Sequence, residues 1–359
     1  MRRTLLPTGR TERALLERRL TQLWYGESGG ASLLQPLSWL YGLVTRCRRW
    51  AYASGCLAVQ RAGKPVVVVG NLTVGGAGKT PLVAWLAERL SDSGLKVGIV
   101  SRGYGRTHSA PQVVHVESSW RDVGDEPLLL RRLTGCDTVV AGDRVAGARE
   151  LVARGADVII ADDGLQHLRL ARDCEIVVVD GARGFGNGRL LPAGPLREPA
   201  ARLRYASATV VNGAPEHASL LVGEHSLGAT AMRMTLLGSD AHRLDGLAIP
   251  QPLESFRGQR VHAVAGIGNP GRFFRDLRVR GLELIEHAFP DHHPFVASDL
   301  DFGDLLPVLM TEKDAVRCRA LASARLWYVP VVAGFDAAQA QQLLDQVVSR
   351  LGPSLRAGG

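Results

Sequence analysis

The chain of 359 residues is 46% hydrophobic and 22% charged, which excludes an intrinsically disordered protein and, with 41 Gly in no regular period, a collagen-like one. Its length predicts two domains, each large enough to bury its own core. The formal net charge is +8, and residues 1–60 carry nine Arg and three Glu, a net of +6. A basic end is compatible with nucleic acid or with an anionic membrane surface, and composition alone leaves both open.

The first predicted element is an N-terminal amphipathic helical segment, residues 1–58. It is rich in Leu and Arg and contains Trp24, Trp39 and Trp50. Tryptophan at headgroup level and Arg side chains facing acidic lipid predict a segment that lies on an anionic membrane surface. Its apolar stretch 33–44 is too short to span a bilayer, which needs about 20 residues. The alternative is a pair of helices that packs on the protein and leaves its arginines in water.

Residues 59–220 predict the larger of the two domains. Short β-branched runs alternate there with helical patterns, which is typical of a doubly wound, mostly parallel α/β sheet with helices on both faces. The predicted strands lie at 65–71, 96–103, 137–142, 157–164, 175–181 and 208–213, and the predicted helices at 79–90, 126–133 and 144–153. A loop rich in Gly and Pro, 181–199, precedes the last of these strands.

Residues 221–359 continue the alternation and predict a second, smaller α/β domain. Its strands are expected at 232–238, 261–268, 282–289, 308–316 and 326–334, and its last helix near 336–351. Phosphoryl transfer proceeds best where water is excluded, so we expect this domain to close over an active site on the first.

The strongest functional motif is VVVVGNLTVGGAGKTP, in which a buried strand leads through a glycine-rich turn into a helix, a P-loop of the kind found in nucleotide-binding proteins. Backbone N–H groups of such a loop point at phosphates, Lys79 would reach the outer phosphates, and the Thr80 hydroxyl would bind Mg²⁺. The loop assigned to the nucleotide comprises Thr73, Val74, Gly75, Gly76, Ala77, Gly78, Lys79 and Thr80. Thr73 departs from the usual motif, which has Gly at that position. The alternative is a tight turn that binds no ligand.

Two acidic pairs accompany this loop. Asp162 and Asp163 follow the apolar run VIIA, where a carboxylate can hold Mg²⁺ directly or through water, unless they only cap a helix or turn the chain. Asp125 and Glu126 precede a predicted helix, where they either cap it or supply the base that accepts a hydroxyl proton. His292, in FPDHHPF, would orient that base or help to bind a metal, unless its motif is a surface turn.

Lysine usage adds one further candidate. The chain has 39 Arg but only four Lys. In so Arg-rich a chain, a retained Lys indicates a place that needs a compact ammonium rather than a planar guanidinium. Lys79 fits this interpretation, and Lys313 in the motif TEKD either shares it or is retained by chance.

Several motifs in a fixed order resemble one family. They are GNLTVGGAGKTP, SRGYGR, VGDEP, ADDGLQH, FGNGRLLPAGPLREP, GIGNPGRFF, FPDHH and TEKD, between residues 70 and 314. The chain thereby resembles the lipid A 4′-kinases, the tetraacyldisaccharide 4′-kinases of Gram-negative bacteria, whose loop is also unusual at the position of Thr73. The resemblance implies that ATP, with Mg²⁺, phosphorylates the 4′-hydroxyl of a tetraacylated glucosamine disaccharide 1-phosphate, a lipid A precursor.

The same resemblance implies a location and further residue roles. The enzyme would be a peripheral or monotopic protein at the cytoplasmic face of the inner membrane, and we expect a monomer. Asp125 resembles the general base of the family, supported by His292. Arg197 and Glu198, in PLREP, resemble an acid–base pair that moves toward the nucleotide. Tyr104 and Arg144 resemble residues of the family that contact the lipid headgroup.

Other classes of protein share parts of this pattern. A P-loop GTPase or ATPase that acts as a membrane-associated targeting or metal-insertion switch has the same glycine loop. Guanine recognition by such GTPases usually uses N/T-K-x-D, however, and TEKD has its Lys one place late. A non-enzymatic adaptor with a vestigial P-loop would not need both Lys79 and Thr80. We expect no nucleic-acid partner, because the basic residues cluster at one end without a recognition helix or a stacking motif.

Overall fold

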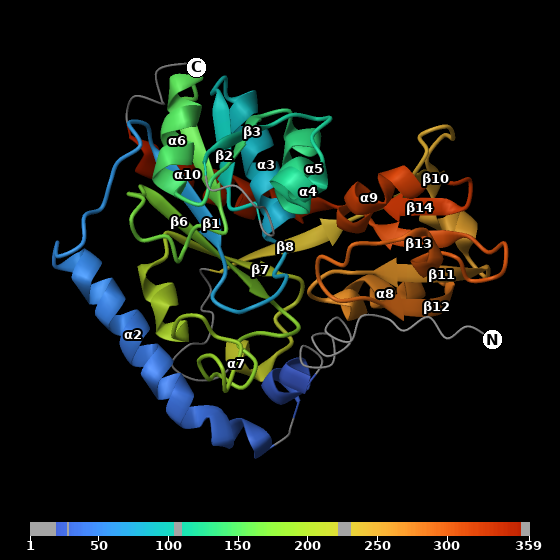
Figure 1. Cartoon of the computed structure of the whole chain (residues 1–359), viewed down its shortest axis with the longest axis horizontal. Helices are drawn as coiled ribbons and strands as arrows, with labels where there is room; N and C mark the ends of the chain where they lie inside the picture. Colours follow the sequence, from blue (N-terminus) through green and yellow to red (C-terminus); the bar gives the residue numbers. More distant parts are fainter. Residues whose placement is uncertain (1–18, 27–28, 104–109, 222–230, 353–359) are drawn as a thin grey trace.

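The protein, seen in a computed structural model, is described over residues 19–26, 29–103, 110–221 and 231–352. Within these residues the chain forms two β-sheets, one of nine strands and one of six. Figure 1 shows the two sheets side by side, each with its own helices. The nine-stranded sheet with its helices is the first domain, and the six-stranded sheet with its helices is the second. The predicted α/β fold with a smaller second domain is confirmed.

The first domain is built on a mostly parallel sheet with the strand order β15-β8-β7-β6-β1-β5-β2-β4-β3. Only the edge strands β3 and β15 run antiparallel to their neighbours. Its strands are β1 (Val66–Gly70), β2 (Val97–Ser101), β3 (Gln112–Val114), β4 (Asp137–Val140), β5 (Val158–Asp162), β6 (Cys174–Asp180), β7 (Ala208–Asn212), β8 (Met232–Leu237) and β15 (Val332–Phe335). Strand β1 lies where the winding reverses, and ligands of such sheets bind at the carboxyl ends of the strands at that point.

Helices cover both faces of this sheet. The valines of β1 alternate in direction. Val67 and Val69 pack with α3 (Lys79–Asp92) and α10 (Ala337–Leu351), and Val66 and Val68 pack with α6 (Arg144–Ala153). Next to α3 lies α5 (Asp125–Thr134), whose Leu130 joins the same cluster. Because consecutive residues of a strand point to opposite faces, a continuous apolar run such as VVVV predicts a strand that is buried on both.

The second domain has the strand order β10-β9-β14-β13-β11-β12. Its strands are β9 (Asp240–Arg243), β10 (Gln251–Pro252), β11 (Arg260–Ala265), β12 (Glu283–Ala288), β13 (Val308–Thr311) and β14 (Leu326–Val329), and its helices are α8 (Pro270–Val279) and α9 (Glu312–Cys318). Other short helices among the described residues are α4 (Trp120–Val123), η2 (Ala200–Tyr205), α7 (Ala218–Leu221), η3 (Leu253–Phe256), η4 (Ala297–Asp299) and η5 (Arg319–Leu321). The loop before α8 and the start of α9 face the first domain.

The division of the chain differs from the predicted boundary near residue 220. Strands β8 and β15 pair with each other in the nine-stranded sheet, and α10 packs on that sheet. The second domain is therefore an insertion between β8 and β15, and the chain returns to the first domain at its C-terminal end. The apolar runs 232–238 and 326–334 were each predicted as one strand of the second domain. The second run instead forms β14 of the six-stranded sheet and β15 of the nine-stranded sheet, because an apolar run does not show which sheet a strand joins.

The N-terminal part that the structure describes contains η1 (Gly29–Leu34) and α2 (Gln35–Ala53). In Figure 1, α2 is the long blue helix along the outside of the first domain. Ser38 is the only buried residue of α2; its hydroxyl donates to the Leu190 carbonyl at 2.8 Å. Among the described residues, no helix has the length and apolar character that crossing a bilayer requires.

Candidate active site

The P-loop follows β1 and leads into α3. Its carbonyl groups are held by two asparagines: the Asn71 amide donates to the Thr73 and Gly75 carbonyls at 2.7 and 3.2 Å, and Asn212 donates to the Ala77 carbonyl at 3.0 Å. Sequence reasoning did not assign either asparagine. Their position at the carboxyl ends of β1 and β7 was the available signal, since polar residues there face the ligand crevice.

Thr73 and Gly78 show what the loop geometry demands of each position. Thr73 is in an extended β-bridge with Leu196, a conformation that any residue adopts, which explains why the usual Gly is dispensable here. Gly78 has a φ of +91°, and a Cβ added there would lie 2.1 Å from the Asn212 amide nitrogen. Only glycine fits at position 78.

Lys79 and Arg197 converge on Asp163. The Lys79 ammonium lies 2.9 Å from the Asn71 side-chain oxygen and 3.3 Å from the Asp163 carboxylate, and the Arg197 guanidinium is 3.2 Å from both Asp163 oxygens. Burial would raise the pKa of Asp163, but Lys79 and Arg197 lower it to about 2. This group is therefore an ionised carboxylate held between two cations.

Asp162 has a different environment, although it is the adjacent residue. It is 1% exposed at the end of β5; one oxygen accepts a hydrogen bond from Ser101 at 3.1 Å, and the other has no hydrogen-bond partner among the described residues. Burial, with the nearby charges of Glu126 and Asp163, raises its pKa to about 7. An orphaned buried carboxylate oxygen at the end of β5 fits a divalent cation such as Mg²⁺. No group of three His, Cys, Asp or Glu forms a metal site on its own within the described ranges.

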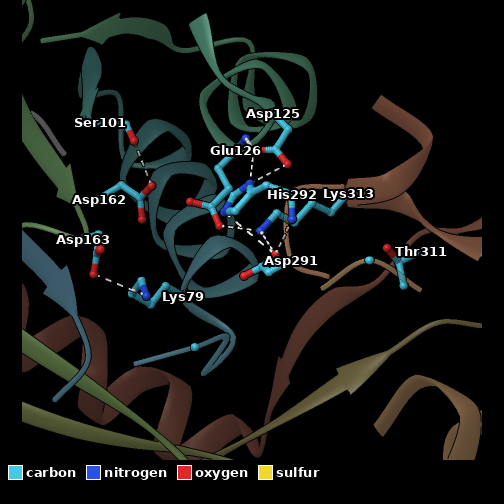
Figure 2. A network of polar contacts seen from close by, with 12 residues as sticks. Lys79, Ser101, Asp125, Glu126, Asp162, Asp163, Asp291, His292, Thr311 and Lys313 are labelled. Atoms are coloured by element: carbon cyan, nitrogen blue, oxygen red, sulfur yellow. Dashed lines mark hydrogen bonds and ion pairs between the residues drawn. The ribbon is translucent and has the colours of Figure 1, made fainter. Parts of the chain in front are cut away.

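A carboxylate–imidazole pair joins the two domains (Figure 2). Asp125, the first residue of α5, is buried, and its two oxygens each lie 2.9 Å from Nδ1 of His292 in the second domain. The Arg317 Nε is 3.5 Å from the same carboxylate. Burial would raise the pKa of Asp125, but the hydrogen bond from His292 and the charges of Lys313 and Arg317 hold it well below its usual range.

Lys313 binds carboxylates of both domains. Its ammonium is 2.8 Å from Glu126 of α5 and 3.1 Å from Asp291, the residue before His292. Figure 2 shows these side chains pointing toward one another between α5 and α9. The structure thus brings together Asp125, Glu126, His292 and Lys313, which the sequence singled out in three separate motifs. Arg317 was not singled out, because nothing in the sequence marks its contact with Asp125.

Two of the predicted residues have other partners, and a third is not described. Glu198 is buried next to Arg197 in sequence but points to other partners, since it accepts a hydrogen bond from Gln166 at 3.0 Å and lies 3.4 Å from Arg49 of α2. Arg144 begins α6, is buried, and donates to the Ala141 carbonyl at 2.8 Å. Tyr104 lies outside the described residues.

A cavity of about 180 Å³ lies between the P-loop and the second domain. Its walls are residues 76–81 of the P-loop, Glu126 on α5, the GIGNPG loop of the second domain and Lys313 on α9. The GIGNPG loop also contacts the P-loop directly, because a Cβ added at Gly268 would lie 2.4 Å from the Gly76 nitrogen. The same cavity therefore meets the predicted phosphate-binding loop and the group around Glu126.

Comparison with known proteins decides the family. The family model described as tetraacyldisaccharide-1-P 4′-kinase matches residues 30–349. The chain belongs to the tetraacyldisaccharide-1-P 4′-kinase family. A tetraacyldisaccharide 4′-kinase of Alkalilimnicola ehrlichii is 51% identical over 87% of this chain and 91% of its own length, and one of Aromatoleum aromaticum is 49% identical over 92% and 98%.

A solved structure of this family agrees in fold. The crystal structure of LpxK from Aquifex aeolicus in complex with ATP superimposes with a TM-score of 0.73 at 29% identity, covering 90% of this chain and 99% of that one. The family resemblance that the ordered motifs predicted is confirmed, and the chain is a kinase. The match names the family and the fold; the roles of single side chains depend on the geometry given above.

Proposed function

We propose that this chain transfers the γ-phosphate of ATP to the 4′-hydroxyl of a tetraacylated glucosamine disaccharide 1-phosphate. The observation that carries the proposal is that the P-loop and the acidic start of α5 meet at one cavity, with a carboxylate–imidazole pair beside it. Such a site can bind a nucleotide and accept a proton from an alcohol, which is the chemistry of a kinase. A GTPase switch, the alternative, needs no carboxylate–imidazole pair of this kind, and the family does not favour it.

The chemical step follows from this arrangement. The 4′-oxygen attacks the γ-phosphorus, the bond from that phosphorus to the bridging oxygen breaks, ADP leaves, and the hydroxyl proton passes to Asp125. Because the transition state of phosphoryl transfer is loose, the proton moves late, and an ionised carboxylate of low pKa suffices as acceptor. His292 orients Asp125 through its Nδ1 hydrogen bond.

The other charged groups are proposed to bind the nucleotide and its metal ion. Lys79 would contact the outer phosphates, with the N–H groups of the P-loop around them. Thr80 and Asp162, with Glu126 or Asp163 nearby, would hold Mg²⁺, which would neutralise charge on the phosphates. Mg²⁺ usually takes only one or two protein carboxylates and completes its shell with phosphate and water, in keeping with so small an acidic cluster.

Further residues of the proposal border this centre. Arg197, already paired with Asp163, is suited to hold the nucleotide, whereas Glu198 would have to leave Gln166 to act with it. Arg144 and Tyr104 are proposed to contact the lipid headgroup. We also propose that a monomer is the active form.

We also propose that the protein works at the cytoplasmic face of the inner membrane. One side of α2 contacts the first domain, through Ser38 and the Tyr41 hydroxyl, which donates to the Arg197 carbonyl at 3.1 Å. Its other side exposes the large apolar residues Leu37, Trp39, Leu40, Leu43, Val44 and Trp50. An apolar face of this kind beside exposed arginines suits an anionic lipid surface. Replacing Trp39 and Leu43 with Glu should abolish co-sedimentation with vesicles that contain phosphatidylglycerol, and unchanged co-sedimentation would contradict the proposal.

Closure of the second domain over the first remains a proposal as well. Its support is the contact between Gly268 and Gly76, which leaves no room for a phosphate group between the two loops. Nucleotide binding would then require the domains to separate and close again. Distances between spin labels on α6 and α8 should change when a non-hydrolysable ATP analogue and Mg²⁺ are added; identical distance distributions would refute it.

The proposed activity has a direct test. The protein is incubated with labelled ATP, Mg²⁺ and the detergent-dispersed disaccharide 1-phosphate, and the lipid products are separated. We expect a bisphosphorylated lipid whose formation stops in Lys79→Ala. Hydrolysis of GTP but not ATP, without a lipid product, would favour the nucleotide switch instead.

A further inference from the structure

We propose that Lys313 is a positioning residue for the Asp125–His292 pair: through Asp291 it holds the His292 backbone, and through Glu126 it fixes the first turn of α5. This inference rests on the proposed function, because it assigns Lys313 to the same phosphoryl transfer. Lys313 itself is not proposed to touch the substrate.

The contact with Asp291 is the first part of the argument. His292 has a φ of +59°, a left-handed conformation that is unfavourable for a non-glycine residue and persists only where neighbouring contacts enforce it. The His292 N–H donates to the Asp291 side chain at 3.0 Å, and the same Asp291 oxygen accepts from the Lys313 ammonium at 3.1 Å. Lys313 therefore anchors the carboxylate that keeps His292 in the conformation from which its ring reaches Asp125.

The contact with Glu126 is the second part. Glu126 lies directly after Asp125 on α5, and its carboxylate is 2.8 Å from the Lys313 ammonium. One ammonium thus fixes both members of the pair, each through its neighbour in sequence. The Lys313 side chain is 16% exposed. Burial alone would lower the pKa of Lys313, but Glu126 and Asp291 raise it above its usual range, so the ammonium stays charged.

A purely structural role explains this arrangement less well. Buried ion pairs are often replaced by apolar contacts without loss of stability, so the pairing is not needed merely to join two domains. The choice of Lys in a chain with 39 Arg agrees with a compact ammonium placed between two carboxylates of different domains.

The test compares full-length variants in the lipid kinase assay. Lys313→Met should lower kcat about 10- to 100-fold while KM for ATP changes less than about twofold, because a misplacement of about 1 Å has an effect of that size. Lys313→Arg, which keeps the charge, should lie between Lys313→Met and the wild type. The matched control is Lys64→Met, since Lys64 forms an exposed pair with Asp157 at 3.4 Å; it should leave kcat unchanged.

A double variant checks the route through Asp291. Asp291→Asn should lower kcat by itself, and the combination with Lys313→Met should be no slower than the slower single variant, because both changes break one chain of contacts. Wild-type kcat in Lys313→Met, a rise in its KM for ATP that matches the loss of kcat, or multiplicative effects in the double variant would each overturn the inference. If Lys313→Met does not fold, Asp291→Asn decides alone, and wild-type kcat in that variant overturns the inference. A wild-type protein that makes no bisphosphorylated lipid would instead refute the proposed function.

Discussion

Two groups of side chains around the cavity, called the phosphate end and the base end after their proposed roles, are assembled in different ways. The side-chain contacts of the phosphate end are made within the first domain, by Asn71, Lys79, Asp162, Asp163, Arg197 and Asn212, although the GIGNPG loop of the second domain lies against the P-loop there. The base end combines Asp125 and Glu126 of the first domain with Asp291, His292, Lys313 and Arg317 of the second. The side-chain contacts of the phosphate end therefore do not need the second domain, whereas those of the base end need both domains. This difference predicts that nucleotide binding and phosphoryl transfer respond to different substitutions.

The largest expected effect lies at the base end. Asp125→Ala removes the proposed proton acceptor and should lower kcat about 10²–10⁴-fold with little change in KM for ATP. Initial rates at varied ATP and lipid concentrations measure both. The control is Asp122→Ala, an exposed carboxylate on the preceding helix α4, which should leave kcat unaffected. Near-wild-type kcat in Asp125→Ala would return Asp125 to a helix-capping role.

The next effect concerns the phosphate end and should spare the base end. Gly78→Ala places a methyl group against Asn212 and imposes a left-handed alanine, so KM for ATP should rise about tenfold or more, while KM for the lipid stays unchanged. Gly94→Ala is the matched control, because Gly94 also has a positive φ, +82°, but open space around its added Cβ. Equal KM values for ATP in both variants would show that contact with Asn212 does not shape the loop.

The smallest effect is on stability and depends on pH. In the folded protein the pKa of Asp162 is raised to about 7 by burial and by Glu126 and Asp163. The folded state therefore holds this proton where the unfolded chain has lost it, and raising the pH from about 4 to 7 destabilises the metal-free protein. Asp162→Asn should raise Tm by a few degrees at pH 8 in EDTA and by clearly less at pH 5. Thermal melts of Asp122→Asn, at an exposed carboxylate, provide the control; an equal gain at both pH values in Asp162→Asn would contradict the account.

The same pKa predicts how the metal binds. Mg²⁺ competes with the proton of Asp162, so its affinity for the protein should increase as the pH rises from 6 to 8. Calorimetric titration with Mg²⁺ and an ATP analogue in buffers of different ionisation enthalpy measures the protons released. Asp162→Asn should remove that proton release.

The phosphate end was largely predictable from sequence, for a local reason. Strand, glycine turn, Lys79 and Thr80 are contiguous, and the acidic pair Asp162 and Asp163 follows an apolar run of its own. Local patterns of this kind predict where their side chains lie, because the carboxyl ends of parallel strands meet at one edge of a sheet. The sheet, its helices and the existence of a second domain followed from the same alternation of patterns.

The base end was predictable only in part. Asp125 and His292 were singled out from separate motifs, but 167 positions separate them, and nothing local shows that Lys313 lies between Glu126 and Asp291. The domain boundary was misplaced for a similar reason, because strand pairing of β8 with β15 depends on contacts across the whole inserted domain. Contacts of this kind depend on tertiary docking, which short-range pattern does not encode.

The separation of the two ends is tested most directly by His292→Ala. The affinity for Mg²⁺ and ATP and the single-turnover rate of lipid phosphorylation are measured on the same preparation of wild type and variant. We predict an unchanged dissociation constant for ATP, within about twofold, and a transfer rate at least about tenfold lower. Loss of ATP affinity with a preserved transfer rate would contradict the account, because it would place His292 of the second domain at the phosphate end.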